Sequence, residues 1–340
     1  PKGLISKPYF KLEMKKKIAL VTGGFSGEAQ ISYKSATTIY NHLDKALYDV
    51  YKIDISPDGW IYEDEEGKKS AIDKNDFSIN VGAQKVRFDA VFMGMHGTPG
   101  EDGKLQGYFD LLQIPYTCCN AATSAITFNK RYTVAVASMA GINVAQSLHL
   151  FKHTGYDVAQ ILNTLQLPYF VKPNNGGSSI GMSKVTRADQ LEYALQKAFA
   201  EDDQVLVEEM IQGREFTVGV YKSGGKIHVL PMTEVTAHNE FFDFEAKYQG
   251  KSSEVTPAQM DDSWHQKIEA AAQKIYAVFD CRGVVRIDFI YNEEKGAPYM
   301  LEINTIPGQS DASIIPQQVA AAGGNLKDFY SSLLQEVLKS

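Results

Sequence analysis

The sequence predicts an α/β protein with more than one domain, and three observations support this prediction. The chain has 340 residues, of which 44% are hydrophobic, enough to bury two or three cores. Residues 18–55 show a short apolar strand, a glycine-rich loop, a helix and a second strand, the order found in open α/β sheets. Residues 284–303 alternate like two strands of a hairpin.

Composition and charge restrict the classes of partner. The formal net charge is -7 and the pI is near 5.6, so we expect no nucleic-acid or acidic-membrane partner. No apolar run approaches the ~20 residues of a transmembrane helix. Cys118, Cys119 and Cys281 have neither zinc spacing nor a disulfide framework, which favours a reducing cytoplasm. Residues 1–13, before Met14, carry no pattern and are interpreted as an extension or expression scar.

The first domain is expected to contain an open parallel sheet. Its predicted elements, in chain order, are strand Ile18–Val21, a helix from near Glu28 to Leu43, strand Asp49–Ile55, strand Ala90–Met93, helix Lys104–Leu112 and strand Ile114–Thr117. Loops at the carboxyl ends of such strands form binding sites. The loop that contains His96 is therefore expected to border a site.

The first glycine loop has two interpretations. With Gly24, Gly27 and Asp54 as a ribose acceptor, it also fits the dinucleotide-binding domain of a nicotinamide-dependent oxidoreductase. However, Thr22 stands where the first glycine of G-x-G-x-x-G would be, and Glu28 at the helix start would repel a pyrophosphate. Glu28 either compensates the helix dipole, worth ~0.3–1 kcal/mol, or awaits the ammonium group of a ligand.

The middle of the chain predicts strands around a flap. The expected elements are a helix from Asn129-Lys130 to Ala140 and strands Val144–Leu150, Leu167–Pro173, Ser183–Val185 and Gln204–Ile211. Residues 174–182 are rich in Gly and Ser and follow Lys172 at a strand end. Bare N–H groups and hydroxyls there suit a phosphate-covering flap, although a flexible hairpin has the same composition. The chain has no G-x-x-x-x-G-K-[ST] motif, which excludes a P-loop.

The last third of the chain predicts a strand at Glu215–Val220, a helix at about Asp261–Phe279 and a final amphipathic helix at Leu326–Leu338. Residues 232–257 show no clean period and are rich in aromatic and charged side chains. A long irregular segment of this kind inside a compact domain is typical of a lid or of disorder.

The hairpin carries the strongest chemical signal. Arg286 and Asp288 project from one face of its first strand, and Glu302 and Asn304 share a face of its second strand. If the strands pair, Asp288, Glu302 and Asn304 converge as oxygen ligands that suit Mg²⁺. Gly308 follows in a loop, where glycine lets the backbone approach a ligand closely. Solvated acids on an ordinary hairpin give a similar pattern, but Arg286 and the carboxamide favour a metal site.

Seven short motifs occur in order along residues 18–340: G-G-x-S-x-E, H-G-x-x-G-E-D-G, V-K-P-x-x-x-G-S-S-x-G-M, E-F-T-V, E-A-K-Y, R-I-D and L-E-x-N-T-x-P-G. Together they resemble the D-alanine–D-alanine ligase family of ATP-grasp enzymes. The resemblance implies an ATP-grasp fold of three α/β domains and a homodimer. The implied domains are a Rossmann-like domain at 14–119, a central domain at 120–209, and a C-terminal domain at 210–340 with a lid at 236–257.

The resemblance also implies an activity. ATP phosphorylates the carboxylate of one D-alanine, and the amine of a second attacks the acylphosphate to give D-alanyl-D-alanine for peptidoglycan. The implied cofactors are ATP and two Mg²⁺ ions, which Mn²⁺ can replace, and a monovalent cation is compatible with this set. The remaining alternatives are another ATP-grasp ligase of acids and amines, a D-alanine–D-lactate ligase and a non-catalytic ATP-binding module.

Individual roles follow from the same resemblance. The nucleotide is assigned to Lys130, Lys172, Ser178, Ser179, Glu208, Glu209, Ile211, Glu215 and Lys247. The substrates and the reacting atoms are assigned to Glu28, His96, Ser178, Lys247, Tyr248, Arg286, Gly308 and Ser313. In this assignment Glu28 takes the first ammonium, Arg286 and the Gly308 N–H bind the oxyanion, and Ser313 takes the second carboxylate. The metal ligands are Asp288, Glu302 and Asn304.

Four departures from the family pattern stand out. Asn175-Gly176 replace a common Arg-Glu in the flap, and Ala312 replaces a common His beside Ser313. Ala29-Gln30 replace charged residues, and Glu209 replaces a Lys found in some relatives. Tyr248 is characteristically replaced in relatives that make D-alanyl-D-lactate, so its presence favours an amine nucleophile.

Overall fold

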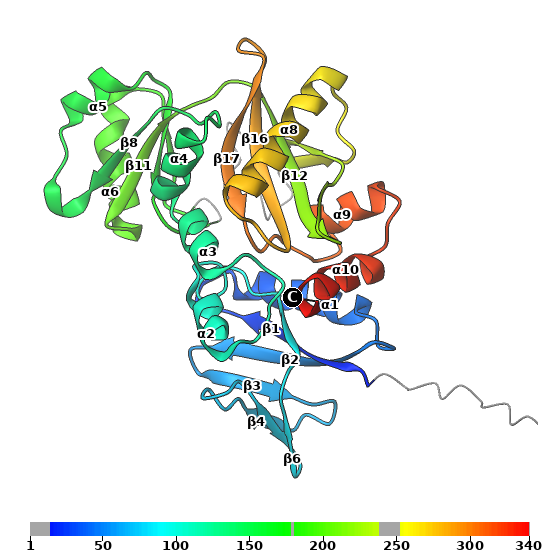
Figure 1. The fold of residues 1–340 in the computed structure, drawn as a ribbon. Coiled ribbons are helices and arrows are strands. Elements are labelled where there is room, and N and C mark those ends of the chain that lie inside the picture. The colour runs from blue at the N-terminus through cyan, green and yellow to red at the C-terminus, as the bar shows by residue number, and fades with distance from the viewer. Residues whose placement is uncertain (1–13, 178–179, 238–251, 340) are drawn as a thin grey trace, which may run out of the picture.

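The structure is a computed structural model that describes residues 14–177, 180–237 and 252–339. It has three lobes, each built on one main β-sheet (Figure 1). The five-stranded sheet has the order β4-β3-β2-β1-β7, and the four-stranded sheet the order β10-β9-β11-β8. The third sheet has the order β15-β14-β12-β16-β17, with β13 paired to β12. The predicted α/β class is confirmed.

The N-terminal lobe is the predicted open sheet. Its elements are β1 (Lys16–Gly23), α1 (Ala29–His42), β2 (Tyr48–Ser56), β3 (Gly59–Glu63), β4 (Lys69–Ala71), β5 (Ile79–Val81), β6 (Gln84–Val86), β7 (Ala90–Met93) and α2 (Lys104–Leu112). β1 pairs in parallel with both β2 and β7. The predicted strand Ile114–Thr117 is wrong, because only Tyr116 bridges to Val91. Pro115 has no N–H to extend the ladder, and the Ile114 N–H bonds back to Phe109.

The central lobe is an antiparallel sheet covered by helices. Its segment contains α3 (Ala121–Phe128), α4 (Lys130–Met139), β8 (Ser147–Phe151), η1 (Lys152–Thr154), α5 (Val158–Thr164), β9 (Tyr169–Pro173), β10 (Ser183–Val185), η2 (Ala188–Gln190), α6 (Leu191–Glu201) and β11 (Gln204–Glu209). β8 and β9 begin later than predicted, in part because Pro168 lacks an N–H. α6 buries Leu191, Ala194, Leu195 and Ala198 at helical spacing against this sheet.

The C-terminal sheet contains the predicted hairpin. Its elements are β12 (Arg214–Ser223), β13 (Lys226–Val229), β14 (Thr233–Ala237), β15 (Ser252–Val255), α8 (Asp262–Val278), β16 (Val284–Asn292) and β17 (Ala297–Asn304). The prediction of an irregular segment over 232–257 is wrong at both ends, because β14 and β15 pair there. Strands of five and four residues are too short to show a clear period.

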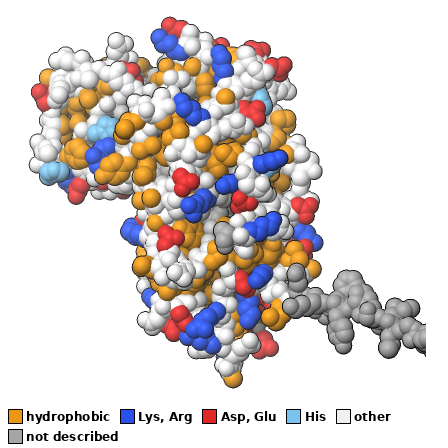
Figure 2. All heavy atoms as spheres, in the orientation of Figure 1, with side chains coloured by type: hydrophobic (Ala, Val, Ile, Leu, Met, Phe, Trp, Pro, Cys, Tyr) orange, Lys and Arg blue, Asp and Glu red, His pale blue; other side chains and the backbone are white. Residues whose placement is uncertain are grey.

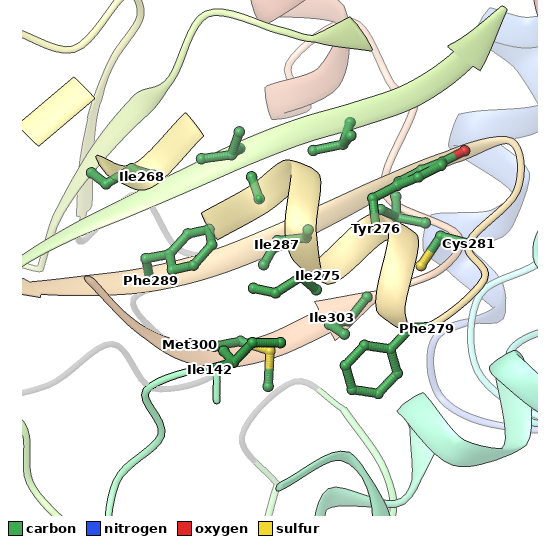
Figure 3. Close-up of a cluster of buried hydrophobic side chains, with 14 of the residues drawn as sticks. Ile142, Ile268, Ile275, Tyr276, Phe279, Cys281, Ile287, Phe289, Met300 and Ile303 are labelled. Atoms are coloured by element: carbon green, nitrogen blue, oxygen red, sulfur yellow. The ribbon is translucent and has the colours of Figure 1, made fainter. Parts of the chain in front are cut away.

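α8 packs across the β16–β17 hairpin and buries its apolar face. Ile287 and Phe289 from β16 and Met300 and Ile303 from β17 meet Ile275 of α8 (Figure 3). A β-bulge shifts the register after Asp288, which pairs with Glu302, so that Phe289 pairs with Met300. The extra residue lets Met300 and Ile303, three positions apart, both reach the core.

The last two helices return to the N-terminal lobe. α10 (Leu326–Leu338) lies beside α1, and α9 (Ile314–Ala321) packs on α10 (Figure 1). The Tyr330 ring meets Phe92 of β7 edge-on at 5.5 Å. The first and last parts of the chain thus share one hydrophobic core. The predicted domain limits remain a prediction.

The surface drawn in Figure 2 mixes charges of both signs. Lys and Arg side chains lie among Asp and Glu side chains over all three lobes on this face. Within the described residues, no helix is long and apolar enough to cross a membrane.

Gly283 provides a test of how β16 is anchored. Its φ is +63°, and an added Cβ would lie 1.9 Å from the carbonyl oxygen of Thr117. Gly82 has nearly the same φ, +62°, with nothing within 4 Å. Gly283→Ala should therefore lower the free energy of unfolding by about 1–3 kcal/mol more than Gly82→Ala does. Urea unfolding followed by circular dichroism measures both, and equal losses would contradict the contact.

Candidate active site

A cavity of about 370 Å³ lies where the N-terminal and C-terminal lobes meet. Its walls come from α1 and the loops after β1 and β7, from α3, α4 and the flap, from β12 and β14 to β17, and from the loop between β17 and α9. Ten of the predicted site residues line it: Glu28, His96, Lys130, Glu215, Arg286, Asp288, Glu302, Asn304, Gly308 and Ser313. Residues from separate parts of the sequence therefore converge on one cavity.

Four predicted site residues lie outside the cavity lining, and four more are not among the described residues. Lys172, Glu208 and Glu209 belong to the central lobe, Ile211 lies between β11 and β12, and all four are outside the cavity lining. Ser178, Ser179, Lys247 and Tyr248 lie outside the described residues. Lys172 and Glu208 form an ion pair of 2.7 Å between β9 and β11, with little side-chain exposure. The Glu209 carboxylate accepts the Gln166 N–H at 3.1 Å.

Arg286 and Asp288 form a forked ion pair on the cavity face of β16. The Arg286 Nε and Nη2 atoms each donate to one oxygen of Asp288 at 2.8 Å. The same Nη2 lies 3.6 Å from Glu302 Oε1 on β17, and Thr217 of β12 also donates to Asp288. Such a bidentate, charge-assisted pair fixes both side chains. The two strands therefore present Arg286 in a defined place beside two acids.

The residues on the paired strands fit a hard cation. Asp288 lies directly opposite Glu302, and Arg286 lies opposite Asn304. Two carboxylates and a carboxamide provide only oxygen donors, which is the preference of Mg²⁺. Arg286 and Thr217 use only part of the acceptor capacity of Asp288. A carboxylate offers about four lone-pair sites, so Asp288 can also bind a cation. The Asn304 oxygen also accepts the Ile306 N–H at 3.1 Å, which orients it.

The Glu28 carboxylate is held between two glycines. A Cβ on Gly97 would lie 2.5 Å from Glu28 Oε2, and a Cβ on Gly177 would lie 2.9 Å from Glu28 Oε1. Gly97 belongs to the loop after β7 and has φ +68°, whereas Gly177 belongs to the flap. The absence of side chains at both positions lets the N-terminal loop and the flap close on this acid.

Glu101 is a second acid beside Glu28. It lines the same cavity, and its Oε2 accepts the Gly97 N–H at 2.6 Å. Partial burial, followed by the neighbouring Glu28, raises the pKa of Glu101 to about 8. His96 in the same loop is buried, and that burial lowers its pKa to about 4. At neutral pH Glu101 therefore tends to keep its proton, whereas His96 is neutral.

The flap departs from the family pattern in a way that the structure explains in part. Asn175 donates through its backbone N–H and its Nδ2 to Asp202, both at 2.8 Å. The Lys130 Nζ donates to the Gly176 carbonyl at 2.8 Å. The base of the flap is thus tied to the end of α6 and to the start of α4.

Two family models cover most of the chain. The model described as the D-ala D-ala ligase N-terminus matches residues 17–119. The model described as the D-ala D-ala ligase C-terminus matches residues 134–335. The chain belongs to the D-alanine–D-alanine ligase family. The ATP-grasp fold expected from the seven motifs is confirmed, with solved structures of this family as its neighbours.

Relatives of this ligase family resemble the chain over nearly its full length. The D-alanine–D-alanine ligase of Flavobacterium johnsoniae is 43% identical over 320 residues, covering 94% of this chain and 98% of that protein. Among solved structures, the VanG D-Ala:D-Ser ligase from Enterococcus faecalis has a TM-score of 0.86 at 29% identity, covering 95% and 99%. The D-alanine–D-alanine ligase from Bacillus anthracis complexed with ATP has a TM-score of 0.76 at 25% identity, covering 95% of this chain and 98% of that chain.

Several lining residues of this ligase were not assigned from the sequence. They are Lys34, Glu101, Thr217, Glu254 and Ser310. Lys34 follows Ile31, another lining residue, at helical spacing, which would have indicated a common face of α1. Ser310 Oγ lies 2.7 Å from Ser313 Oγ, and only the loop conformation brings them together.

Glu101 gives this ligase a pH dependence of stability that a neutral variant should lack. Its pKa is raised in the native state from 4.5 to about 8, so the native state holds a proton that the unfolded chain releases. This contribution is therefore lost as the pH rises through that interval. Relative to Glu101→Gln, the wild-type protein should lose thermal stability between about pH 5 and pH 9. Melting temperatures of both proteins measured across this range test the prediction. A difference between them that does not change with pH would show that Glu101 is ionised throughout and would contradict it.

Proposed function

We propose that this protein is an ATP-dependent ligase that joins two D-alanines to D-alanyl-D-alanine for peptidoglycan synthesis. The observation that carries the proposal is the convergence of Glu28, Arg286 and Gly308 on one cavity with the oxygen donors Asp288 and Glu302. An acid for an ammonium group, donors for an oxyanion and ligands for a cation are what carboxylate activation requires.

In this proposal the nucleotide lies between the central and C-terminal lobes. Lys130 and Lys172 contact its phosphates, and Glu208, Glu209, Ile211 and Glu215 surround its base and ribose. Asp288, Glu302 and Asn304 would hold two Mg²⁺ ions, which Mn²⁺ could replace. Bound Mg²⁺ would neutralise phosphate charge and orient the γ-phosphate for in-line transfer. Ser178, Ser179 and Lys247 of the flap and lid complete the phosphate site.

The first step activates the carboxylate of the first D-alanine. Glu28 binds the ammonium group and so places the substrate beside Arg286. A carboxylate oxygen attacks the γ-phosphorus of ATP. The bond between that phosphorus and the oxygen bridging to the β-phosphate breaks, and ADP leaves. Arg286 is well placed to hold the reacting carboxylate, because its own guanidinium is fixed by the two 2.8 Å bonds to Asp288.

The second step forms the peptide bond. The amine of the second D-alanine attacks the acyl carbon, and the resulting oxyanion is stabilised by Arg286 and the Gly308 N–H. In the collapse of this tetrahedral intermediate the bond from the acyl carbon to the phosphate oxygen breaks, phosphate leaves with the electron pair, and the nitrogen releases a proton to solvent. The second carboxylate is held by Ser313, with Ser310 beside it, at the N-terminus of α9, where the helix dipole favours an anion.

The second-substrate end of the cavity favours an amine over a hydroxyl nucleophile. Glu254 and Ala312 both line the cavity there. Gln317 Nε2 donates to Glu254 at 3.2 Å and to the Ala312 carbonyl at 2.9 Å, which joins β15 to this loop. A carboxylate in this wall attracts the ammonium group of D-alanine, whereas the hydroxyl of D-lactate is uncharged and gains less. Tyr248 in the lid supports the same choice.

The proposal extends to organisation and setting. We propose that the three sheets correspond to domains near 14–119, 120–209 and 210–340, and that two copies of the chain form a homodimer in the cytoplasm. A monovalent cation is compatible with the nucleotide site. Size-exclusion chromatography with light scattering tests the dimer, and a monomer at micromolar concentration would contradict it.

The activity has a direct substrate test. With ATP and Mg²⁺, D-alanine should release ADP and phosphate in equal amounts and yield the dipeptide, whereas L-alanine should not. D-lactate added with D-alanine should give little depsipeptide at neutral pH. Chromatography of products with coupled ADP detection measures all three. A preference for D-lactate, or ADP release without dipeptide, would point to one of the alternative activities.

Arg286 tests the oxyanion role. Removing one such donor typically costs about 10²–10³ in rate, so Arg286→Ala should show that loss in kcat with a small change in the KM for ATP. Arg187→Ala is a matched control, because Arg187 forms the same kind of ion pair with Asp189, two residues on, at an exposed place. Its kcat should equal that of the wild type. An Arg286→Ala defect confined to the KM for ATP would make Arg286 a phosphate clamp.

A further inference from the structure

We infer that Ser35 and His96 of the N-terminal lobe hold the loop that carries Gly308, and that Ser35 is a positioning residue for the oxyanion site. The inference rests on the proposed function, because it concerns the donor that the Gly308 N–H supplies. Ser35 lies on α1 and is fully buried. His96 lies in the loop after β7 and is 5% exposed.

Two hydrogen bonds connect these side chains to the loop after β17, and a third joins the two side chains to each other. The Gln309 N–H donates to Ser35 Oγ at 3.0 Å. Ser35 Oγ lies 2.8 Å from His96 Nε2, and His96 Nδ1 lies 2.7 Å from the Ile306 carbonyl oxygen. A fourth bond fixes the His96 backbone, whose N–H donates to Ser32 Oγ of α1 at 2.9 Å.

The partners determine where the protons lie. The Ile306 carbonyl can only accept, so His96 Nδ1 carries the hydrogen. Ser35 Oγ accepts from the Gln309 N–H and uses its own hydrogen toward His96 Nε2, which is therefore the unprotonated nitrogen. Both ring nitrogens are bonded to protein, and the ring is the neutral Nδ1–H tautomer. Burial, and then the nearby Arg286, lower the pKa of His96 and so disfavour a charged ring.

Two of these bonds hold the loop, one on each side of Gly308. One bond fixes the carbonyl of Ile306, and another fixes the N–H of Gln309. Only Pro307 and Gly308 lie between these points, and Pro307 has a restricted φ. The Gln309 side chain adds a local bond, from its Nε2 to the Pro307 carbonyl at 3.2 Å. The direction of the Gly308 N–H is therefore set by groups that belong to the other lobe.

A second anchor comes from the last helix. The Tyr330 hydroxyl of α10 donates to Gln309 Oε1 at 3.1 Å, and both side chains are buried. The Gly308 loop thus lies between α1, the His96 loop and α10. This arrangement makes the oxyanion donor depend on packing between the lobes. A preorganised donor stabilises developing charge without reorganisation, so small displacements reduce the rate.

The expected effect falls on the chemical step. Ser35→Ala removes the hydroxyl that links Gln309 to His96, and the loop loses one of its two flanking anchors. We expect kcat to fall about tenfold to a hundredfold, less than the loss typical for removal of an oxyanion donor. The KM for ATP should change less than twofold, because Ser35 is not among the residues that line the cavity.

Ser124→Ala is the matched control. Ser124 is also a fully buried helical serine, and its hydroxyl donates to a backbone carbonyl, that of Cys119, at 3.3 Å. It lies on α3 and does not line the cavity. Its substitution should lower stability without lowering kcat. If Ser35→Ala and Ser124→Ala lose stability alike and both keep wild-type kcat, Ser35 is only structural and the inference fails.

A spectroscopic measurement on the unmodified protein tests the same inference. Nitrogen-15 NMR of histidine-labelled enzyme should show His96 as a neutral Nδ1–H tautomer that does not titrate between about pH 5.5 and 8. In Ser35→Ala the shift of Nε2 should change, because its hydrogen-bond donor is lost. A His96 ring that titrates near its ordinary value, or carries its hydrogen on Nε2, would overturn the proton assignment and the inference.

Different results would contradict the proposed function and the positioning role of Ser35. If the wild-type protein releases no ADP with D-alanine, the proposed function fails, whereas the tautomer measurement still stands. If the wild type is active and Ser35→Ala retains full kcat, the proposed function stands and the positioning role of Ser35 is wrong.

Discussion

The pairing of β16 with β17 is the constraint on which the site depends. The register places Asp288 opposite Glu302 and Arg286 opposite Asn304, with β12 supplying Thr217 on the other side of β16. One face of this ladder therefore carries the polar groups of the cavity, while the other carries Ile287, Phe289, Met300 and Ile303 under α8. Burial of those apolar side chains, each worth roughly 1.5–3 kcal/mol, fixes the register, and the register fixes the oxygen donors.

The other half of the site comes from a different sheet. The N-terminal lobe contributes Glu28, which Gly97 and Gly177 enclose, and the Ser35–His96 pair that holds the loop after β17. α10 packs on the N-terminal sheet and also donates to Gln309. The loop after β17, which carries Gly308, is therefore held by groups of the N-terminal lobe and by α10, although its residues follow directly from the hairpin. This sharing explains how a small backbone donor such as Gly308 can be held without a rigid element of its own.

Elements with a strong local period could be predicted from the sequence. The helix Lys104–Leu112, the final helix and the hairpin agree with the structure because their apolar spacing reflects the face that they bury, and the strand Ala90–Met93 agrees because it is a short apolar run buried along its whole length. The strand Ile114–Thr117 could not form, because Pro115 interrupts the ladder. The shared face of the acids was predictable, whereas the β-bulge after Asp288 was not, since alternation alone carries no information about an extra residue.

Long-range contacts account for the rest. Ser35 sits in an ordinary helix, and only the fold places it against Gln309, far along the chain. Glu101 belongs to a recognised motif, yet its raised pKa depends on burial beside Glu28. All the assigned residue roles remain predictions, and Lys172, Glu208, Glu209 and Ile211 in addition lie outside the cavity lining. Those assigned to Ser178, Ser179, Lys247 and Tyr248 remain predictions because these residues lie outside the described part of the chain.

The acylphosphate route is tested most directly by labelling the carboxylate oxygens of D-alanine. Activation of a carboxylate by phosphoryl transfer moves one of its oxygens to the phosphate that is released. With D-alanine labelled with ¹⁸O in its carboxylate, each phosphate produced should contain a single labelled oxygen, detected by the isotope shift in phosphorus-31 NMR. Unlabelled phosphate formed together with dipeptide would contradict the acylphosphate route and the assignment of roles in the cavity.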